Sequence, residues 1–183
     1  MKIIHRLFAA VVLLSLTGCN VLPTPQGDSV RYFTLSAPVA APAPSDGTTV
    51  RPVQLAGHLR NREMAVRVAE NEVVYLEDVR WAESLGDAFT QLLRARLGSL
   101  GGKNVVSVQV LRCEPVRFQG NSVQLAATYT ILPPGEIEPG RRGVFTAGTR
   151  TWDGKDYGAL VGLLRDEVGE LGDAIASAIA EKK

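Results

Sequence analysis

Apolar and polar residues alternate, or β-branched and aromatic residues gather, in several short stretches of this chain. Both patterns are typical of strands, whose side chains point to opposite faces in turn. Glu70-Asn71-Glu72 separates two of the stretches and predicts a hairpin, while Pro52 places another at a sheet edge or a strand start. The predicted strands cover residues 30–35, 50–55, 64–69, 73–76, 104–118, 121–132 and 143–152.

Two longer stretches repeat their apolar residues every three or four positions, which predicts helices. The first begins at Trp81, ends before Gly101-Gly102 and carries its apolar face on Trp81, Leu85, Ala88, Phe89, Leu92 and Leu97. The second begins near Asp153 and has a heptad seam at Tyr157, Val161, Leu164, Val168, Leu171, Ile175 and Ala178. Such a seam suits a coiled coil, but packing on the domain's own sheet is the more frequent use, and we expect that packing here.

The elements follow one another as strands, helix, strands, helix. This order predicts an α+β fold, a two-layer sandwich with two main helices on one face of a mostly antiparallel sheet. Residues 37–49 contain Pro38, Pro42 and Pro44 and are expected to form an exposed connection within the domain. We therefore assign residues 30–183 to one domain.

The N-terminus follows a different pattern. An apolar run of ten residues, Leu7 to Leu16, follows two basic residues and ends at Leu16-Thr17-Gly18-Cys19. A membrane-spanning helix needs about 20 apolar residues, so this run is instead typical of a secretory signal peptide. The leucine two positions before Gly-Cys resembles the lipobox of bacterial lipoproteins, which implies that Cys19 is acylated and that the chain is cut just before it.

These features divide the first 29 residues into two parts. Residues 1–18 are predicted to be a lipoprotein signal peptide, and the proline-containing residues 19–29 a tether. By resemblance to lipoprotein sorting in bacteria with two membranes, Asn20 rather than aspartate after Cys19 favours the periplasmic face of the outer membrane. Acyl chains contribute about 0.8 kcal/mol per buried methylene, so such an anchor would hold the protein stably on its membrane.

Composition narrows the function further. Twenty basic residues against 19 acidic ones give a net charge of +1, which argues against nucleic-acid binding. Two histidines and two cysteines are too few for a Cys/His zinc site, and no phosphate-binding loop is present. With Cys19 acylated, Cys113 has no second cysteine with which to form an internal disulfide. We interpret Cys113 as a buried strand residue, and a reactive pair with His58 is the alternative. We expect no enzymatic activity, no cofactor and no metal site.

The final helix contains glycines at positions where each costs about 1 kcal/mol relative to alanine. Gly162, Gly169 and Ala176 are seven residues apart and form one stripe beside the heptad seam. We predict that this stripe lets a partner's backbone approach closely. The alternative is that these glycines contact the domain's own sheet.

Four segments together resemble a known family. They are Tyr32-Phe33-Thr34-Leu35, Met64-Ala65-Val66-Arg67, Trp81-Ala82-Glu83-Ser84-Leu85 and the helix start Tyr157-x-x-Leu160-Val161. In their order and spacing, over about residues 30–181, the chain resembles the ABC-type transport auxiliary lipoproteins of the paraquat-inducible protein C type. It departs at Ser84, where the family has proline, and at residues 55–61, where the family tends to have Leu-Pro-x-Tyr-Leu-Asp-Arg.

The resemblance implies a non-enzymatic role. Such lipoproteins work with an inner-membrane protein that carries mammalian-cell-entry (MCE) domains and with an ABC-type permease and ATPase. The system is expected to move phospholipid or other apolar molecules between membranes, with the lipoprotein as its outer-membrane docking component that supports membrane integrity. Two alternatives remain: a periplasmic lipoprotein that holds a lipid or small ligand between helices and sheet, and a hydrolase that uses Cys113.

Overall fold

The computed structural model describes residues 29–35, 47–118, 120–136 and 140–181. The predicted signal peptide, Cys19 and nearly all of the predicted tether lie outside these residues. In chain order the elements are β1 (Arg31–Phe33), β2 (Thr49–Val50), β3 (Gln54–Leu55), the 3₁₀ turn η1 (Gly57–Leu59), β4 (Glu63–Ala69), β5 (Glu72–Trp81), α2 (Leu85–Leu97), β6 (Val105–Val116), β7 (Ser122–Leu132), β8 (Arg141–Thr146), β9 (Arg150–Thr151) and α3 (Tyr157–Ala180).

The described strands join in one sheet of nine strands with the order β1-β5-β4-β6-β7-β8. β2 and β3 pair with β6, and β9 pairs with β7. The sheet is mixed: β4–β5, β6–β7, β7–β8 and β7–β9 are antiparallel, whereas β1–β5, β2–β6, β3–β6 and one residue pair of β4–β6 are parallel. The prediction of an α+β fold is confirmed. The sheet is mixed because the short strands β1, β2 and β3 pair in parallel with strands that lie far along the chain. The long ladders β4–β5, β6–β7 and β7–β8 are antiparallel.

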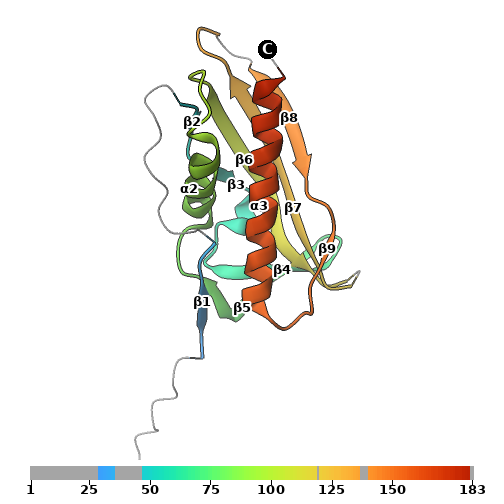
Figure 1. Ribbon diagram of the computed structural model, residues 1–183. Helices are drawn as coiled ribbons and strands as arrows, with labels where there is room; N and C mark the ends of the chain where they lie inside the picture. Colours follow the sequence, from blue (N-terminus) through green and yellow to red (C-terminus); the bar gives the residue numbers. More distant parts are fainter. Residues whose placement is uncertain (1–28, 36–46, 119, 137–139, 182–183) are drawn as a thin grey trace, which may run out of the picture.

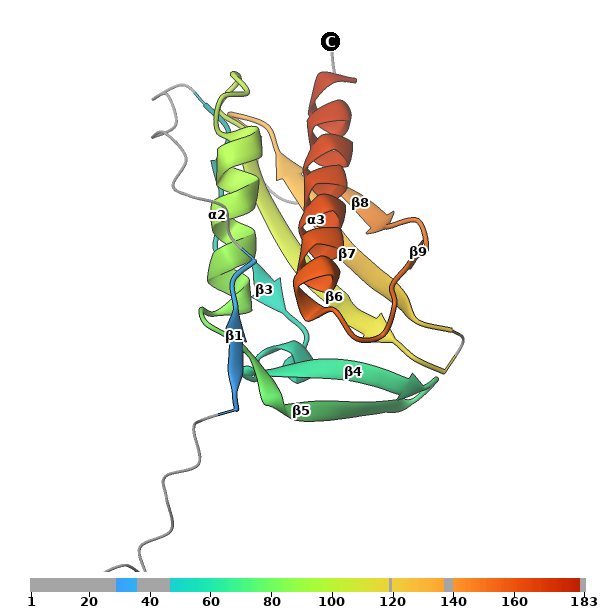
Figure 2. The same ribbon diagram turned by 60° about the horizontal axis from the view of Figure 1, so that its bottom comes forward.

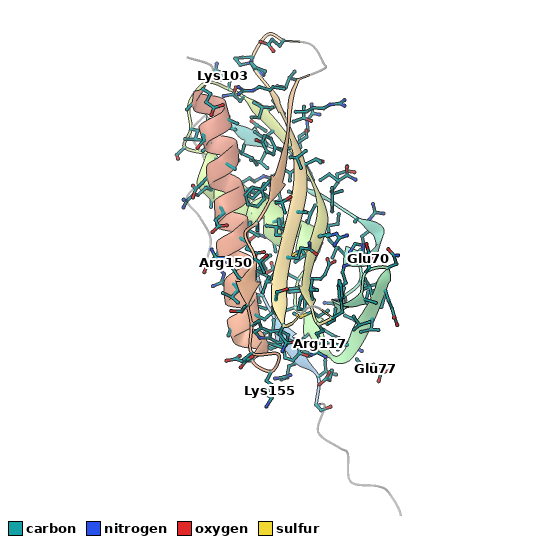
Figure 3. All side chains as sticks on the ribbon, turned by 90° about the vertical axis from the view of Figure 1, so that its right-hand side faces the viewer. Glu70, Glu77, Lys103, Arg117, Arg150 and Lys155 are labelled. Atoms are coloured by element: carbon teal, nitrogen blue, oxygen red, sulfur yellow. The ribbon has the colours of Figure 1, made fainter. Side chains whose placement is uncertain are left out.

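The two helices lie side by side in front of β6 and β7 (Figure 1). The β4–β5 hairpin runs crosswise to these strands at one end of the sheet (Figure 2), and it projects on the side away from α3 (Figure 3). Buried residues of both helices and of the sheet form one core, which includes Phe89, Leu93, Leu125, Leu164 and Leu171. The expectation that the α3 seam packs within its own domain is confirmed, since all its residues except Ala178 are buried.

The predicted hairpin is present, but its second strand is longer than predicted. β5 continues to Trp81, which therefore ends a strand and does not begin the helix. The backbone N–H of Trp81 donates to the carbonyl of Arg62 at 2.8 Å, and its side chain is only 3% exposed. Helix α2 starts four residues later, where the Ser84 side chain accepts a hydrogen bond from the N–H of Asp87. It ends at Leu97, before the predicted Gly101-Gly102 stop.

Two other predicted strands are each divided in two. Residues 50–55 form β2 and β3 with a break at residues 51–53, where Pro52 has no N–H for a ladder and the N–H of Val53 donates to Oγ1 of Thr90 on α2 at 2.9 Å. Residues 143–152 form β8 and β9, separated by residues 147–149. Helix α3 begins at Tyr157, because the Asp156 carboxylate caps its first turn by accepting the N–H groups of residues 158 and 159.

Candidate docking groove between the two helices

A groove of about 310 Å³ runs along the surface between α2 and α3. Leu92 and Ala95 of α2 and Val168 of α3 give it an apolar lining, and Gly169 opens its α3 side. Two arginines, Arg96 of α2 and Arg165 of α3, complete the lining. The groove therefore combines an apolar surface with cationic side chains, a combination that suits an amphipathic segment of another protein.

Both arginines are held in place by hydrogen bonds. The Arg96 guanidinium donates to the Asp173 carboxylate, with Nε 2.7 Å from Oδ1, and so bridges the two helices. The Arg165 Nε donates to the carbonyl of Leu35 at 3.0 Å, which joins α3 to the segment after β1. The Arg96–Asp173 ion pair is exposed to solvent, so it contributes at most about 1 kcal/mol to stability. Its main effect is to define the shape of the groove.

The glycines of α3 fall into two kinds. A Cβ added at Gly162 or Gly169 would meet no atom within 4 Å, so these two positions face open space. A Cβ added at Gly172 would lie 2.9 Å from Cγ of Arg96, so this glycine allows the close approach of α2 and α3. The alternative that Gly162 and Gly169 contact the domain's own sheet is therefore wrong. Both positions have open space beside them, although only Gly169 lines the groove.

The third residue of the predicted stripe, Ala176, is half-buried and packs at the margin of the core. It shares the α2-facing side of α3 with Gly169 by helical spacing, but it does not line the groove. The leucine and arginine side chains of the groove were not among the predicted site residues. The apolar pattern of α2 could have identified Leu92, whereas the pairing of Arg96 with Asp173 joins residues 77 positions apart and has no local pattern.

The side of α3 away from this groove carries an unusual carboxylate. Glu167 is fully buried, and neither of its carboxylate oxygens has a hydrogen-bond partner. The pKa of Glu167 is raised to about 7, mainly because burial disfavours the charged form. The charge of Arg150 lowers this pKa and the charge of Glu170 raises it further. The carboxyl group is therefore half protonated near neutral pH. Its spacing of three and four residues from Leu164 and Leu171 of the seam was a sequence feature that could have indicated burial.

A second buried carboxylate, Glu114 of β6, has several partners. Its Oε1 accepts hydrogen bonds from Nε of Arg67 at 2.9 Å, and Nη2 of Arg67 lies 2.7 Å from the same atom. Its Oε2 accepts the N–H of Cys113 at 2.8 Å, and Nε2 of His58 lies 3.4 Å from it. Glu114 thus joins β4 and η1 to β6, and the sequence alternative of a Cys113–His58 pair is replaced by contacts of His58 with Glu114.

The thiol of Cys113 itself belongs to the hydrophobic core. Burial raises the pKa of Cys113 well above its usual value, and the nearby charges of Glu114 and Glu167 raise it further. The thiol therefore stays protonated at neutral pH, and a protonated thiol is a poor nucleophile. The interpretation of Cys113 as a buried strand residue is confirmed.

Comparison with known proteins now assigns the chain to a family. The sequence profile of the ABC-type transport auxiliary lipoprotein component matches residues 33–176. The chain belongs to this family. The matched region of this auxiliary lipoprotein component includes both helices up to Ala176, and therefore the whole lining of the groove. No curated protein matches the sequence significantly.

Two solved structures share the fold of this auxiliary component. A crystal structure of an uncharacterized protein superposes with a TM-score of 0.65 at 15% identity, over 81% of this chain and 97% of the other. Protein XCC0632 from Xanthomonas campestris, of the DUF330 family, superposes with a TM-score of 0.64 at 14% identity, over 80% and 92% of the two chains. At these identities the likeness establishes the fold alone. In the described part of this family member, neither helix is long and apolar enough to cross a membrane.

Proposed function

We propose that this auxiliary component is the outer-membrane lipoprotein of an MCE/ABC-type system that transports lipid between membranes. In this proposal the acylated Cys19 holds the domain on the periplasmic face of the outer membrane. The domain docks an MCE-domain protein that works with an ABC-type permease and ATPase, and it has no catalytic role. The observation that carries the proposal is the family match over residues 33–176, because it makes the chain an auxiliary part of an ABC-type transport system.

The groove between α2 and α3 is the proposed docking site. Its apolar lining is open at the surface, and Gly169 leaves space in which a partner's backbone could come close. Gly162 lies two turns earlier on the same side of α3, also with open space around it. A glycine in a helix interior lowers helix stability, so two glycines that face open space favour a use outside the domain.

The ligand-binding alternative has less support. A lipid held between helices and sheet needs a well-formed cavity in that layer. The facing side chains of this layer, which include Phe89, Leu93, Leu164 and Leu171, are instead fully buried against one another. The hydrolase alternative is also disfavoured, because the Cys113 thiol is buried and its pKa is raised.

The docking proposal is tested by substitutions at Gly169. Leucine is a better helix former than glycine, so Gly169→Leu should fold while its side chain fills the groove. We expect the variant to recover less MCE-domain protein than wild type in a pull-down from solubilised envelopes, and Gly169→Ala to recover an intermediate amount. Ser177→Leu, on the exposed side of α3, is the matched control and should bind as wild type. Equal recovery by all variants would contradict docking at this groove.

The anchor is tested separately. Metabolic labelling with a palmitate analogue should label the wild-type protein and not Cys19→Ala, because acylation needs the thiol at this position. The uncleaved precursor should accumulate in the variant. Equal labelling of the two proteins would exclude Cys19 as the acylated residue.

A further inference from the structure

Three aromatic rings pack together at the end of the domain where β1 and α3 begin. The centroid of Tyr157 lies 5.3 Å from that of Trp152 and 6.3 Å from that of Phe33. The Trp152 Nε1 donates to the carbonyl of Asp156 at 2.7 Å, so the indole is fixed against the first turn of α3. The rings thus join β1, the segment before α3 and α3 itself into a rigid base.

Two arginines lie on this base. The guanidinium carbon of Arg31 is 5.1 Å from the ring centroid of Tyr157, and that of Arg117 is 5.8 Å from the ring centroid of Trp152. Arg117 also donates through Nη2 to the hydroxyl of Tyr157 at 2.9 Å. Cation–π contacts of this kind hold the guanidinium groups in place although both residues are exposed.

Each arginine is followed in the sequence by an exposed aromatic residue. Tyr32, after Arg31, is 53% exposed, and Phe118, after Arg117, is 40% exposed. Figure 3 shows Arg117 and Lys155 together at this end of the molecule, and Figure 1 shows β1 and α3 starting there. Neighbouring side chains of a strand alternate, so Tyr32 of β1 points away from the rings that Arg31 covers. We call this end of the domain, with Arg31 and Arg117 over the rings and Tyr32 and Phe118 exposed next to them in the chain, the aromatic end.

The charges near the aromatic end are of both signs. Asp153 accepts the backbone N–H groups of Lys155 and Asp156, and these hydrogen bonds lower the pKa of Asp153. Asp156 accepts the N–H groups of the first turn of α3. Asp153 therefore stays ionised at neutral pH, at the same end of the domain as the arginines and Lys155. Because charges of both signs lie here, the character of this surface comes from its arginine and aromatic side chains and not from net charge.

We propose that the aromatic end rests on the surface of the membrane to which the protein is anchored. Tyrosine rings are favourable at the level of the lipid headgroups, phenylalanine rings at the boundary between headgroups and acyl chains, and guanidinium groups can contact the phosphates. This inference rests on the anchor of the proposed function. The eleven residues from Cys19 to Ser29 are joined by ten steps and can span at most about 36 Å, so an acylated Cys19 keeps this end near the bilayer.

The orientation has a consequence for docking. Helix α3 starts at the aromatic end and runs to the opposite end of the domain (Figure 1). Its 24 residues span about 36 Å. With the aromatic end on the lipid headgroups, α3 points away from the membrane, and the groove beside its middle faces the periplasm, where an MCE-domain partner would approach.

Site-directed spin labelling tests this contact on the full mature lipoprotein. The protein is placed in vesicles of phosphatidylethanolamine and phosphatidylglycerol, with a nitroxide at Lys155→Cys near the aromatic end or, as the matched control, at Val144→Cys on β8. Val144 is 76% exposed, and the native Cys113 is too buried to react under these conditions. We expect a nickel chelate to collide severalfold less often with the label at position 155 than with that at position 144.

Substitutions of the exposed rings test whether these side chains make the membrane contact. In the Lys155→Cys background, replacing Tyr32 and Phe118 together by serine should raise the collision rate to that of the control, whereas Tyr32→Trp should keep it low. Circular dichroism melts verify that each variant is folded. Two kinds of failure can be told apart. If the protein does not float with the vesicles, the proposed anchor is wrong. If it floats but the two labels have equal collision rates, or if the double substitution leaves position 155 protected, the aromatic end is not the membrane contact.

Discussion

Glu114 and Glu167 are the same residue type, both are fully buried, and they have opposite surroundings. Glu114 lies where β4 and η1 meet β6 and contacts Arg67, the N–H of Cys113 and His58. Glu167 lies on α3, and neither of its oxygens has a partner. Burial disfavours a carboxylate in both places. At Glu114, the ion pair with Arg67 and the N–H of Cys113 offset that cost, whereas at Glu167 only the charge of Arg150 opposes it, without a hydrogen bond to either carboxylate oxygen. The first region is therefore held together by its charge and the second is weakened by it.

The largest expected effect comes from removing the partner of Glu114. Arg67→Met leaves the Glu114 charge buried with no guanidinium, and breaking a buried pair in this way costs about 3–5 kcal/mol. Urea unfolding at neutral pH measures the loss. The double variant Arg67→Met, Glu114→Leu removes both charges and should recover most of the stability. A single variant as stable as wild type would show that the pair does not hold β4 to β6.

The next effect is a dependence of stability on pH from Glu167. Its pKa rises from 4.5 in the unfolded chain to about 7 in the folded one, so the folded protein binds more protons between these values. Stability from this group is fully present below pH 4.5 and is lost as the pH rises through 7, by about 3 kcal/mol at 1.36 kcal/mol per unit.

Replacing Glu167 by glutamine tests this directly. Because the amide does not ionise, Glu167→Gln should be more stable than wild type at pH 8 and should have a flatter dependence between pH 5 and 8, as measured by urea unfolding. Glu170→Gln, one turn away and more exposed, should retain most of the wild-type dependence. If the free energy of unfolding changed with pH in the same way in wild type and Glu167→Gln, Glu167 would not be the group that causes the pH dependence.

A smaller effect separates the two kinds of glycine on the other side of α3. Gly169→Ala should stabilise the domain by up to about 1 kcal/mol, because its Cβ meets open space and alanine favours the helix. Gly172→Ala should bring no such gain, because its Cβ would lie 2.9 Å from Cγ of Arg96. Thermal melts of both variants measure the effect. An equal rise of the melting temperature in both would contradict the close contact between Gly172 and Arg96.

The smallest effect is expected at His58. Its Nε2 lies 3.4 Å from Oε2 of Glu114, a long contact that adds little to the two stronger partners. His58→Ala should therefore change the free energy of unfolding by less than about 1 kcal/mol. A loss as large as that of Arg67→Met would mean that the three side chains act as one unit.

Features with a local cause could be predicted from the sequence. The turn of the β4–β5 hairpin and the buried seam of α3 follow from short-range patterns and were predicted, although β5 runs five residues beyond its predicted end. The start of α2 was predicted four residues early, because Trp81 has the spacing of a helical residue but is paired as a strand with Phe33 of β1. The open space at Gly169 was consistent with the predicted stripe, whereas the groove around it needed the placement of α2 beside α3.

The family, the α+β class and the heptad seam of α3 were all readable in the sequence, because each depends on residue types and on spacings within one segment. The partners of the two buried glutamates were decided only by the tertiary structure. Arg67 and Glu114 are 47 residues apart and meet because β4 joins the end of β6, while Glu167 follows the same helical spacing as its neighbours but finds no donor opposite. A carboxylate's ionisation depends on what lies within a few ångströms of it, and for buried groups that surrounding is created by the fold.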